Sequence, residues 1–384
     1  FEKIRNSNIV ILYQNRILCT MKICVYAIAK NEEKFVDGWV KSLEGADDIV
    51  VLDTGSTDGT VGRLRSRGVQ VTRKIISPWR FDVARNESLK LVPDDTDLCV
   101  CLDLDERLEA GWREKLEKAY NPKIKQYRYR YTWSFLADGS EGVVFWIEKI
   151  HTPRDFIWTH PVHEVLTYVG KEPYAAAFAD GVQVNHYPDP SKSRSDYLPL
   201  LELSVKECPD DDRNTHYLGR EYMYRGMYDK AIETLTHHLT MPSATWKDER
   251  CASMRYIAAC LRAKNKNGES TSRQTEEWLM KAVAEAPYLR EPYIDAASFY
   301  YARGDWYAVA YFCRKALQIK DRSLSYINEP LCWGAYPYDL LSLAYFHTGN
   351  AALALETIDK AIAVSPEQRL KNNREFFMKA SKHK

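Results

Sequence analysis

Two aspartates at the end of an apolar run are the residues of this chain best suited to bind a metal ion. The segment Asp97 to Glu106 reads DLCVCLDLDE, and Asp103 and Asp105 directly follow its apolar part, Leu98 to Leu102. An apolar run this short predicts a buried central strand, and ligands of open α/β sheets bind at the carboxyl ends of such strands. If the strand continues, both carboxylates point to the same side and suit Mg2+ or Mn2+ bridging a diphosphate. An isolated Asp-x-Asp would more often be an ordinary turn.

Two histidines and a glutamate form a second candidate site. The segment Trp158-Thr-His160-Pro-Val-His163-Glu164 places two imidazoles and a carboxylate within five positions. These groups could complete a metal site or take a proton from a reacting group, and a structural role is the alternative for His160. The His-x-x-His spacing differs from the helical HExxH motif, so a zinc hydrolase is not favoured.

The residues that precede the aspartate pair alternate between strand and helix patterns. The predicted elements are strands at 22–29, 48–53 and 69–73 and helices at 30–43 and 61–67. This alternation predicts a mostly parallel sheet with helices on both faces. Asp53 ends its strand, where it could bind a nucleobase or ribose or could fix the turn that follows. The chain has no GxGxxG and no GxxxxGK[ST] motif, so a dinucleotide dehydrogenase and a P-loop ATPase are unsupported.

Beyond the aspartate pair the pattern changes twice. Alternation over 127–150, interrupted at 139–142, predicts a β-hairpin, and the polar residues 188–195 (PDPSKSRS) read as a linker. From about residue 196 the pattern is helical, and four segments fit a tetratricopeptide-like repeat: 217–242, 258–287, 303–317 and 344–366. The concave face of such an array could bind an extended partner or a second copy of the chain. The expected organisation is a non-native extension at 1–20, an α/β domain at 21–190 and a helical-repeat domain at 196–384.

The composition argues against several classes of function. Of the 384 residues, 45% are hydrophobic and 28% are charged, with a formal net charge of +1. Near-neutrality argues against a generic nucleic-acid coat and against electrostatic docking on anionic membranes. The nine cysteines lack a metal-ligand or disulfide spacing, which favours a reducing, cytoplasmic setting. No apolar run approaches the roughly 18 residues that a membrane span needs.

Three segments resemble, in order, the motifs of family 2 glycosyltransferases with the GT-A fold. They are Ile28-Ala-Lys-Asn-Glu-Glu33, Val50-Val-Leu-Asp-Thr-Gly-Ser-Thr-Asp58 and Asp103-Leu-Asp105. Residues 78–86 (PWRFDVARN), 160–164 (HPVHE) and 185–187 (NHY) are similar to a subgroup in which the GT-A domain precedes helical repeats. That subgroup includes the sublancin-type peptide S-glycosyltransferases. The resemblance covers residues 21–187 as motifs and the remainder as architecture.

The resemblance implies a metal site and a general base. Asp105 would ligate Mn2+ or Mg2+, and Asp103 would contact the metal or the ribose. Either His163 or His186 would be the third metal ligand. Glu164 would take the proton from the acceptor.

The resemblance also implies contacts with a sugar nucleotide. Asp53 would meet the uracil or ribose, and Arg85 would meet the donor phosphates. An Arg-Asn pair directly before a predicted helix at 87–91 is well placed for anion binding, and Asp82 would orient either Arg85 or the donor. The other residues implied in substrate binding are Ala29, Asn31, Glu32, Leu104, Trp133 and Trp158.

The implied activity is metal-dependent transfer of a sugar, with inversion, from a nucleotide-diphosphate sugar such as UDP-glucose or UDP-GlcNAc. The acceptor would be a peptide, a glycan or another molecule, and a homodimer through the helical domain is one expected assembly. Two alternatives stay open. A nucleotidyltransferase uses the same acidic pair, although the chain lacks its Gly-rich pyrophosphate loop, and a non-catalytic repeat scaffold would carry a degenerate nucleotide-binding domain.

Overall fold

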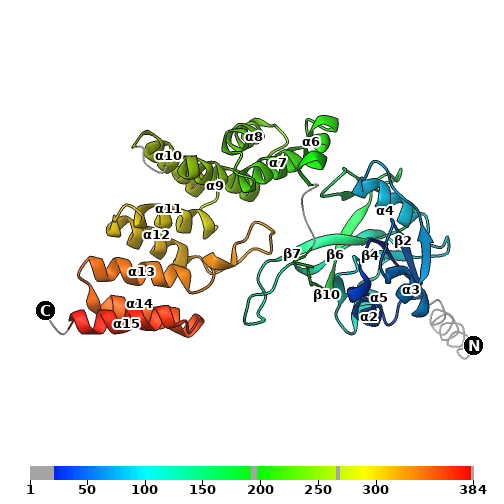
Figure 1. Ribbon diagram of the computed structural model, residues 1–384, viewed down its shortest axis with the longest axis horizontal. Helices are drawn as coiled ribbons and strands as arrows, with labels where there is room; N and C mark the ends of the chain where they lie inside the picture. Colours follow the sequence, from blue (N-terminus) through cyan, green and yellow to red (C-terminus); the bar gives the residue numbers. More distant parts are fainter. Residues whose placement is uncertain (1–20, 192–196, 265–268, 382–384) are drawn as a thin grey trace, which may run out of the picture. The chain divides into compact units, whose positions relative to one another are not determined.

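The computed structural model describes residues 21–191, 197–264 and 269–381 (Figure 1). The extension predicted at 1–20 lies outside the described residues. The chain divides into two compact units, Phe1–Ser134 with Trp146–Lys192 and Phe135–Phe145 with Ser193–Lys384. The tip of the predicted hairpin, Phe135–Phe145, therefore groups with the helical unit.

The first unit is built on a sheet with the strand order β3-β2-β1-β4-β7-β6-β10-β5. Strands β1 to β4 pair in parallel, β7 is antiparallel to β4, β6 is parallel to β10, and β5 is antiparallel to β10. A separate antiparallel pair is formed by β8 and β9. The bounds are β1 (Ile23–Ala29), β2 (Asp48–Asp53), β3 (Gln70–Arg73), β4 (Leu98–Cys101), β5 (Glu106–Leu108), β6 (Ile124–Thr132), β7 (Val144–His151), β8 (Phe156–Thr159), β9 (Val165–Tyr168) and β10 (Ala175–His186).

The central strands are apolar throughout because both of their faces are covered. Strand β4 is buried at every position, and β1 is buried at all but one, which is typical of parallel strands between two helix layers. The register sets Ala29 beside Asp53 and Tyr26 beside Cys101, so the carboxyl ends of β1, β2 and β4 lie at one edge. The order of the strands reverses at β1, and ligands of α/β sheets bind at such a point.

Helices cover both faces of this sheet. In Figure 1, α4 lies on the opposite side of the sheet from α2, α3 and α5. Right-handed crossovers require this arrangement, because α4 returns the chain from β3 to β4 past β1 and β2. The bounds are the 3-10 helix η1 (Glu33–Phe35), α2 (Val36–Ser42), α3 (Thr60–Ser66), α4 (Phe81–Leu89) and α5 (Trp112–Ala119).

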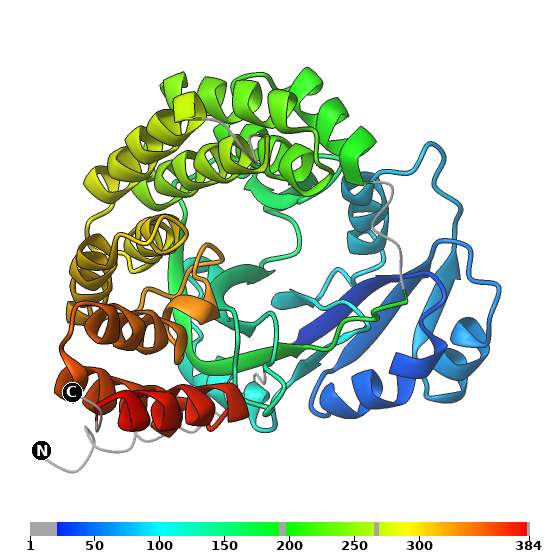
Figure 2. The same ribbon diagram turned by 60° about the vertical axis from the view of Figure 1, so that its left-hand side comes forward.

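The second unit is a series of packed helix pairs, which Figure 2 shows following one another in chain order. The pairs α7–α8, α9–α10, α11–α12 and α13–α14 overlap the four predicted repeats, although the segment predicted at 303–317 covers α12 without α11 and that at 344–366 covers only the end of α13. A Cβ atom at Gly219 would lie 2.6 Å from the Leu235 side chain, so the small residue predicted at the α7–α8 crossing is required there. The bounds are α6 (Tyr197–Glu207), α7 (Asp212–Tyr224), α8 (Tyr228–Thr240), α9 (Lys247–Lys264), α10 (Glu269–Glu285), α11 (Glu291–Tyr301), α12 (Trp306–Gln318), η2 (Pro330–Cys332), α13 (Tyr336–His347), α14 (Ala351–Val364) and α15 (Gln368–Ser381).

These elements confirm the predicted fold class, an α/β sheet domain followed by helical repeats. None of the helices in the described residues combines the length and apolar character that a membrane crossing requires. The cysteines among the described residues are free thiols, and all of them except Cys208 are buried. The predicted cellular compartment stays a prediction.

Candidate active site

The two aspartates lie in a turn between β4 and β5 and not on a continuing strand. Strand β4 ends at Cys101, and the Glu106 amide donates to the Asp103 carbonyl at 2.9 Å to close the turn. The condition for both carboxylates to point to the same side, a continuing strand, is therefore not met. Asp103 meets Arg85 from α4, whereas Asp105 meets His186 at the end of β10.

Asp105 and His186 form a pair, with Asp105 in the turn after β4 and His186 at the end of β10. The His186 Nε2 atom lies 3.4 Å from Asp105 Oδ2, and the Tyr187 amide donates to the Asp105 carbonyl at 2.8 Å. The His186 Nδ1 atom lies 2.9 Å from the Trp133 carbonyl, and the two rings stack at 4.4 Å. His186, one of the two histidines predicted as the third metal ligand, thus lies beside Asp105.

The donor set at this pair fits a divalent cation. Donation from Nδ1 to a carbonyl leaves the Nε2 lone pair facing Asp105, the arrangement common among metal-ligating histidines. Two acceptors at 3.4 Å need a cation or a proton between them. Burial lowers the pKa of His186, but the hydrogen bond and charge of Asp105 outweigh burial and raise that pKa above its ordinary value. A proton can thus occupy the place that a metal ion would take.

Asp103 is held by a buried arginine. The Arg85 side chain donates to both carboxylate oxygens of Asp103, at 2.8 and 2.9 Å, and also to Glu164. Its guanidinium lies over the Trp158 ring, 5.2 Å from the centroid. Burial raises the pKa of Asp103, but the charges of Arg85 and Lys149 outweigh it and hold that pKa far below the usual range. Asp103 is therefore an ionised partner of Arg85.

The prediction of a helix at 87–91 with an anion site before it is wrong. Helix α4 begins at Phe81, which places Arg85 in the middle of the helix and not at its amino-terminal end. The chain begins to turn earlier because the Phe81 amide donates to the Pro161 carbonyl at 3.0 Å. Both carboxylate oxygens of Asp82 accept hydrogen bonds from Arg80, whereas Arg85 donates to Asp103 and Glu164.

Lys149 and Glu106 belong to this site and were missed from the sequence. The Lys149 ammonium lies 3.3 Å from Asp103 and 3.1 Å from Glu106, and Glu106 also accepts from the Tyr131 hydroxyl at 2.7 Å. Burial lowers the pKa of Lys149, but the two carboxylates raise it well above its ordinary value. The sequence did contain one indication, a lysine inside a predicted strand. Its partners, Asp103 and Glu106, lie more than 40 positions away along the chain.

Four carboxylates gather at this site. Asp103, Glu106 and Glu164 pair with Arg85 or Lys149, whereas Asp105 contacts His186 and interacts electrostatically with Arg107. Carboxylate oxygens are the ligands that hard divalent cations prefer. Of the four, Glu106 is 2% exposed, and burial with its acidic neighbours raises its pKa. The cluster consists of Asp103, Asp105, Glu106 and Glu164 with Arg85 and Lys149.

The first two predicted motifs are tied together beside this cluster. The Asn31 side chain accepts from the Thr57 amide at 2.8 Å, and the Asn31 amide donates to Ser56 Oγ at 2.9 Å. Asp53 is fully buried, accepts from the Ser56 amide at 3.2 Å and pairs with Arg73 at 3.0 Å. Of the two roles that the sequence left open for Asp53, the structure shows the turn-fixing one.

The other predicted residues divide into buried supports and exposed groups. Ala29, Leu104 and Trp158 are buried, and Trp158 donates to the Tyr26 hydroxyl at 2.8 Å. The Glu32 amide donates to Thr60 Oγ1 at 2.8 Å, which fixes the loop after β1. Trp133 is 39% exposed and presents part of its ring to solvent beside His186.

Backbone strain among the described residues is confined to the predicted motifs. The non-glycine residues with positive φ there are Asn31 (57°), His160 (75°) and His163 (49°). Such conformations cost roughly 1–3 kcal/mol each and gather at functional sites. The turn between β8 and β9, which carries His160, His163 and Glu164, is thus a candidate part of the site.

The comparisons with known proteins agree with the motifs. No family model matches the chain. It is 33% identical over 99 residues to the lipopolysaccharide core biosynthesis glycosyltransferase LpsC of Rhizobium meliloti (strain 1021), a match that covers 25% of this chain and 36% of that protein. It is 30% identical over 101 residues to an uncharacterized glycosyltransferase of Rickettsia bellii (strain RML369-C), covering 26% and 33%. The chain thus spans about a third of the length of these curated relatives.

Two solved structures are each similar to part of the chain. Glucosyl-3-phosphoglycerate synthase from Mycobacterium tuberculosis, in complex with Mn2+, UDP and glucosyl-3-phosphoglycerate, is 25% identical with a TM-score of 0.24, over 29% of this chain and 44% of its own. A thermophilic TPR protein of Thermus thermophilus is 18% identical with a TM-score of 0.34, over 47% and 88%. The resemblance drawn from the motifs is confirmed to this extent: over about a quarter of its length, the chain is similar to glycosyltransferases.

Proposed function

We propose that this chain is a metal-dependent, inverting glycosyltransferase that uses a UDP-linked sugar. The observation that carries the proposal is the Asp105–His186 pair, fixed at the carboxyl edge of the sheet with the His186 Nε2 atom 3.4 Å from a carboxylate oxygen. The motif resemblance and the similarity to curated glycosyltransferases support the reaction class. The UDP moiety, the sugar and the acceptor rest on the motif resemblance alone.

Asp105 and His186 would hold Mn2+ or Mg2+ in this enzyme. The bound ion would supply neutralisation of the charge that builds on the departing diphosphate. Trp133 fixes the tautomer of His186 through its carbonyl. Arg85 and Lys149 pair with Asp103 and Glu106, which leaves Asp105 to interact with His186.

The fixed loops beside the sheet edge would bind the nucleoside. The Asn31, Ser56 and Thr57 contacts hold two loops together before any ligand arrives. A rigid site lowers the entropy cost of binding, since fewer side chains need to be ordered. Asp53 would contribute by shaping the turn after β2, and in this conformation it would not contact the nucleoside directly.

Glu164 stays the predicted general base. It would take a proton from the acceptor hydroxyl, thiol or amine as that group attacks the anomeric carbon. Glu164 also binds Arg85, because one of its carboxylate oxygens accepts a hydrogen bond from that side chain. Its side chain is 11% exposed, so the carboxylate is only partly open to an acceptor.

The experiment is a screen of UDP-glucose, UDP-GlcNAc and related donors for hydrolysis or transfer in the presence of Mn2+. We expect turnover with at least one donor that chelation abolishes and that Asp105→Asn reduces by about 100-fold or more. The Glu109→Gln protein is the control, because Glu109 is an exposed carboxylate four residues from Asp105. Undiminished turnover in Asp105→Asn would contradict the proposed mechanism.

The two alternatives predict different results in the same preparation. A nucleotidyltransferase would release pyrophosphate from a nucleoside triphosphate and a sugar phosphate. A scaffold would show no metal-dependent heat with UDP. We favour neither alternative, because the Asp105–His186 pair, which suits a metal ion, occurs in a chain that is similar to glycosyltransferases.

A further inference from the structure

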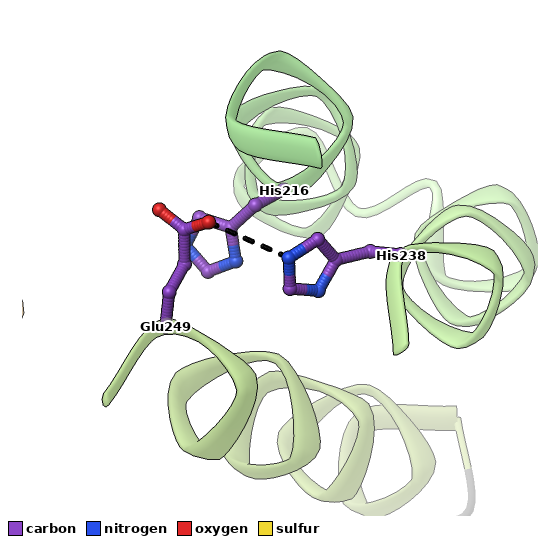
Figure 3. Close-up of side chains that lie close together, drawn as sticks. All are labelled: His216, His238 and Glu249. Atoms are coloured by element: carbon purple, nitrogen blue, oxygen red, sulfur yellow. Dashed lines mark ion pairs between the residues drawn. The ribbon is translucent and has the colours of Figure 1, made fainter. Parts of the chain in front are cut away.

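A second cluster of ligand-type side chains lies inside the helical unit. His216 of α7, His238 of α8 and Glu249 of α9 point toward one another from three consecutive helices (Figure 3). Both histidines are 0% exposed, and Glu249 is 3% exposed. One donor atom from each residue lies within 4.8 Å of the other two.

A single serine orients both imidazoles. Ser253 Oγ of α9 lies 2.8 Å from His216 Nδ1 and 2.9 Å from His238 Nδ1. When both Nδ1–H groups donate to this oxygen, both rings adopt the same tautomer and direct an Nε2 lone pair toward Glu249. A hydrogen bond of this kind, made by the ring nitrogen that does not face the ion, is typical of histidines that ligate metals.

The two Nε2 atoms lack hydrogen-bond partners in the part of the chain that the structure describes. A buried polar atom left without a partner costs about 1–3 kcal/mol, and native structures contain few. Both rings are fully buried, and a neutral imidazole whose Nδ1–H donates presents the lone pair of its Nε2 atom as a metal ligand.

Glu249 completes a donor set with suitable spacing. Its Oε2 accepts from the Tyr326 hydroxyl, and its Oε1 lies 3.4 Å from His238 Nε2. Ligands about 2.0–2.1 Å from a tetrahedral ion stand about 3.4 Å apart, so this pair already has the required separation. A proton on His238 would also satisfy Glu249, but it would leave His216 Nε2 unpaired.

We propose that His216, His238 and Glu249 bind a borderline divalent transition metal ion of the Zn2+ class. Two imidazoles and one carboxylate suit Zn2+ better than Mg2+ or Ca2+, which prefer oxygen ligands. The ion would join α7, α8 and α9 and so stabilise the first helices of the repeat array. This site shares no residue with the Asp105–His186 pair and does not depend on the proposed transfer activity.

The test is a titration of the chelator-treated full chain with Co2+, whose visible absorption reports nitrogen ligation, followed by displacement with Zn2+. The Asp105→Ala background removes the first candidate site. We expect about one Co2+ per chain with this absorption, and a rise in melting temperature when Zn2+ is added. His238→Gln and Glu249→Gln should each lose the absorption, whereas His237→Gln, at the exposed neighbour on α8, should keep it.

A further variant keeps the proposal falsifiable if a ligand variant does not fold. Ser253→Ala retains all three ligands but removes their orienting oxygen, and we expect its Co2+ affinity to fall about 10- to 100-fold. Absence of the absorption in the folded Asp105→Ala chain would overturn the proposal and leave a protonated His238–Glu249 ion pair only. Absorption that survives in folded His238→Gln or is unchanged in Ser253→Ala would also overturn it.

Discussion

Replacing Lys149 with methionine tests the charge cluster that the sequence did not reveal. The ammonium lies 3.1 Å from Glu106 and 3.3 Å from Asp103. At an effective dielectric constant of about 20, each contact corresponds to about 5 kcal/mol of Coulomb attraction, which the desolvation of three buried charges offsets in part. Lys149→Met leaves Glu106 buried without its cation, so we expect the free energy of unfolding of the first unit to fall by about 3–5 kcal/mol.

The assay is urea unfolding, with thiol labelling of Cys99 and Cys101 as the readout. Both cysteines are buried in β4, so their labelling reports on the first unit alone. Lys125→Met is the matched control, because Lys125 makes a more exposed ion pair with Asp155 at 3.1 Å. That change should cost about 0–1 kcal/mol.

The double variant Lys149→Met/Glu106→Gln should recover more than half of the loss, since it removes the unpaired charge while glutamine can still bond Tyr131 and the Asp103 amide. The reasoning is refuted if Lys149→Met costs no more than Lys125→Met, or if the double variant shows no recovery.

Three further predictions concern single side chains. Burial lowers the pKa of His151 from 6.5 to about 4. As the pH drops from about 6.5 toward 4, the unfolded chain therefore binds a proton at this residue that the folded chain does not, and the free energy of unfolding falls. Urea unfolding should show that the fall between pH 7 and pH 5 is about 2 kcal/mol larger in wild type than in His151→Gln. Glu164→Gln should lower kcat by about 100-fold or more with unchanged Mn2+ affinity if Glu164 is the base, and an unchanged kcat would remove that role. Trp133→Leu keeps the carbonyl that binds His186 but removes the ring stacked on it, so Mn2+ affinity should fall by about 3- to 10-fold, and an unaltered affinity would show that the stack contributes nothing.

Patterns of local origin were predictable from the sequence. The apolar run at 98–102 and the alternation over 127–150 correspond to β4, β6 and β7, because burial on both faces and pairing with a neighbour leave a direct trace in residue order. The repeats were equally visible, since the close approach of Leu235 allows only a small residue at Gly219.

Features that depend on distant partners were not predictable. Arg85 was placed before its helix because the contact that starts α4, from the Phe81 amide to the Pro161 carbonyl, joins residues 80 positions apart. Asp103 and Asp105 lie in a turn that Glu106 closes and not on a continuing strand. Lys149 meets Asp103 and Glu106 because β7 lies beside β4. Sheet order is a global property, and a local pattern does not encode it.

The central claim is that Asp105 and His186 hold a divalent ion against the phosphates of a sugar nucleotide. Calorimetric titration of UDP into the chelator-treated chain, with and without Mn2+, tests this most directly. We expect binding that requires Mn2+ and that weakens by about 100-fold or more in both Asp105→Asn and His186→Gln, while Glu109→Gln binds as wild type does. UDP binding of equal strength without Mn2+, or binding unaffected by either substitution, would contradict the account.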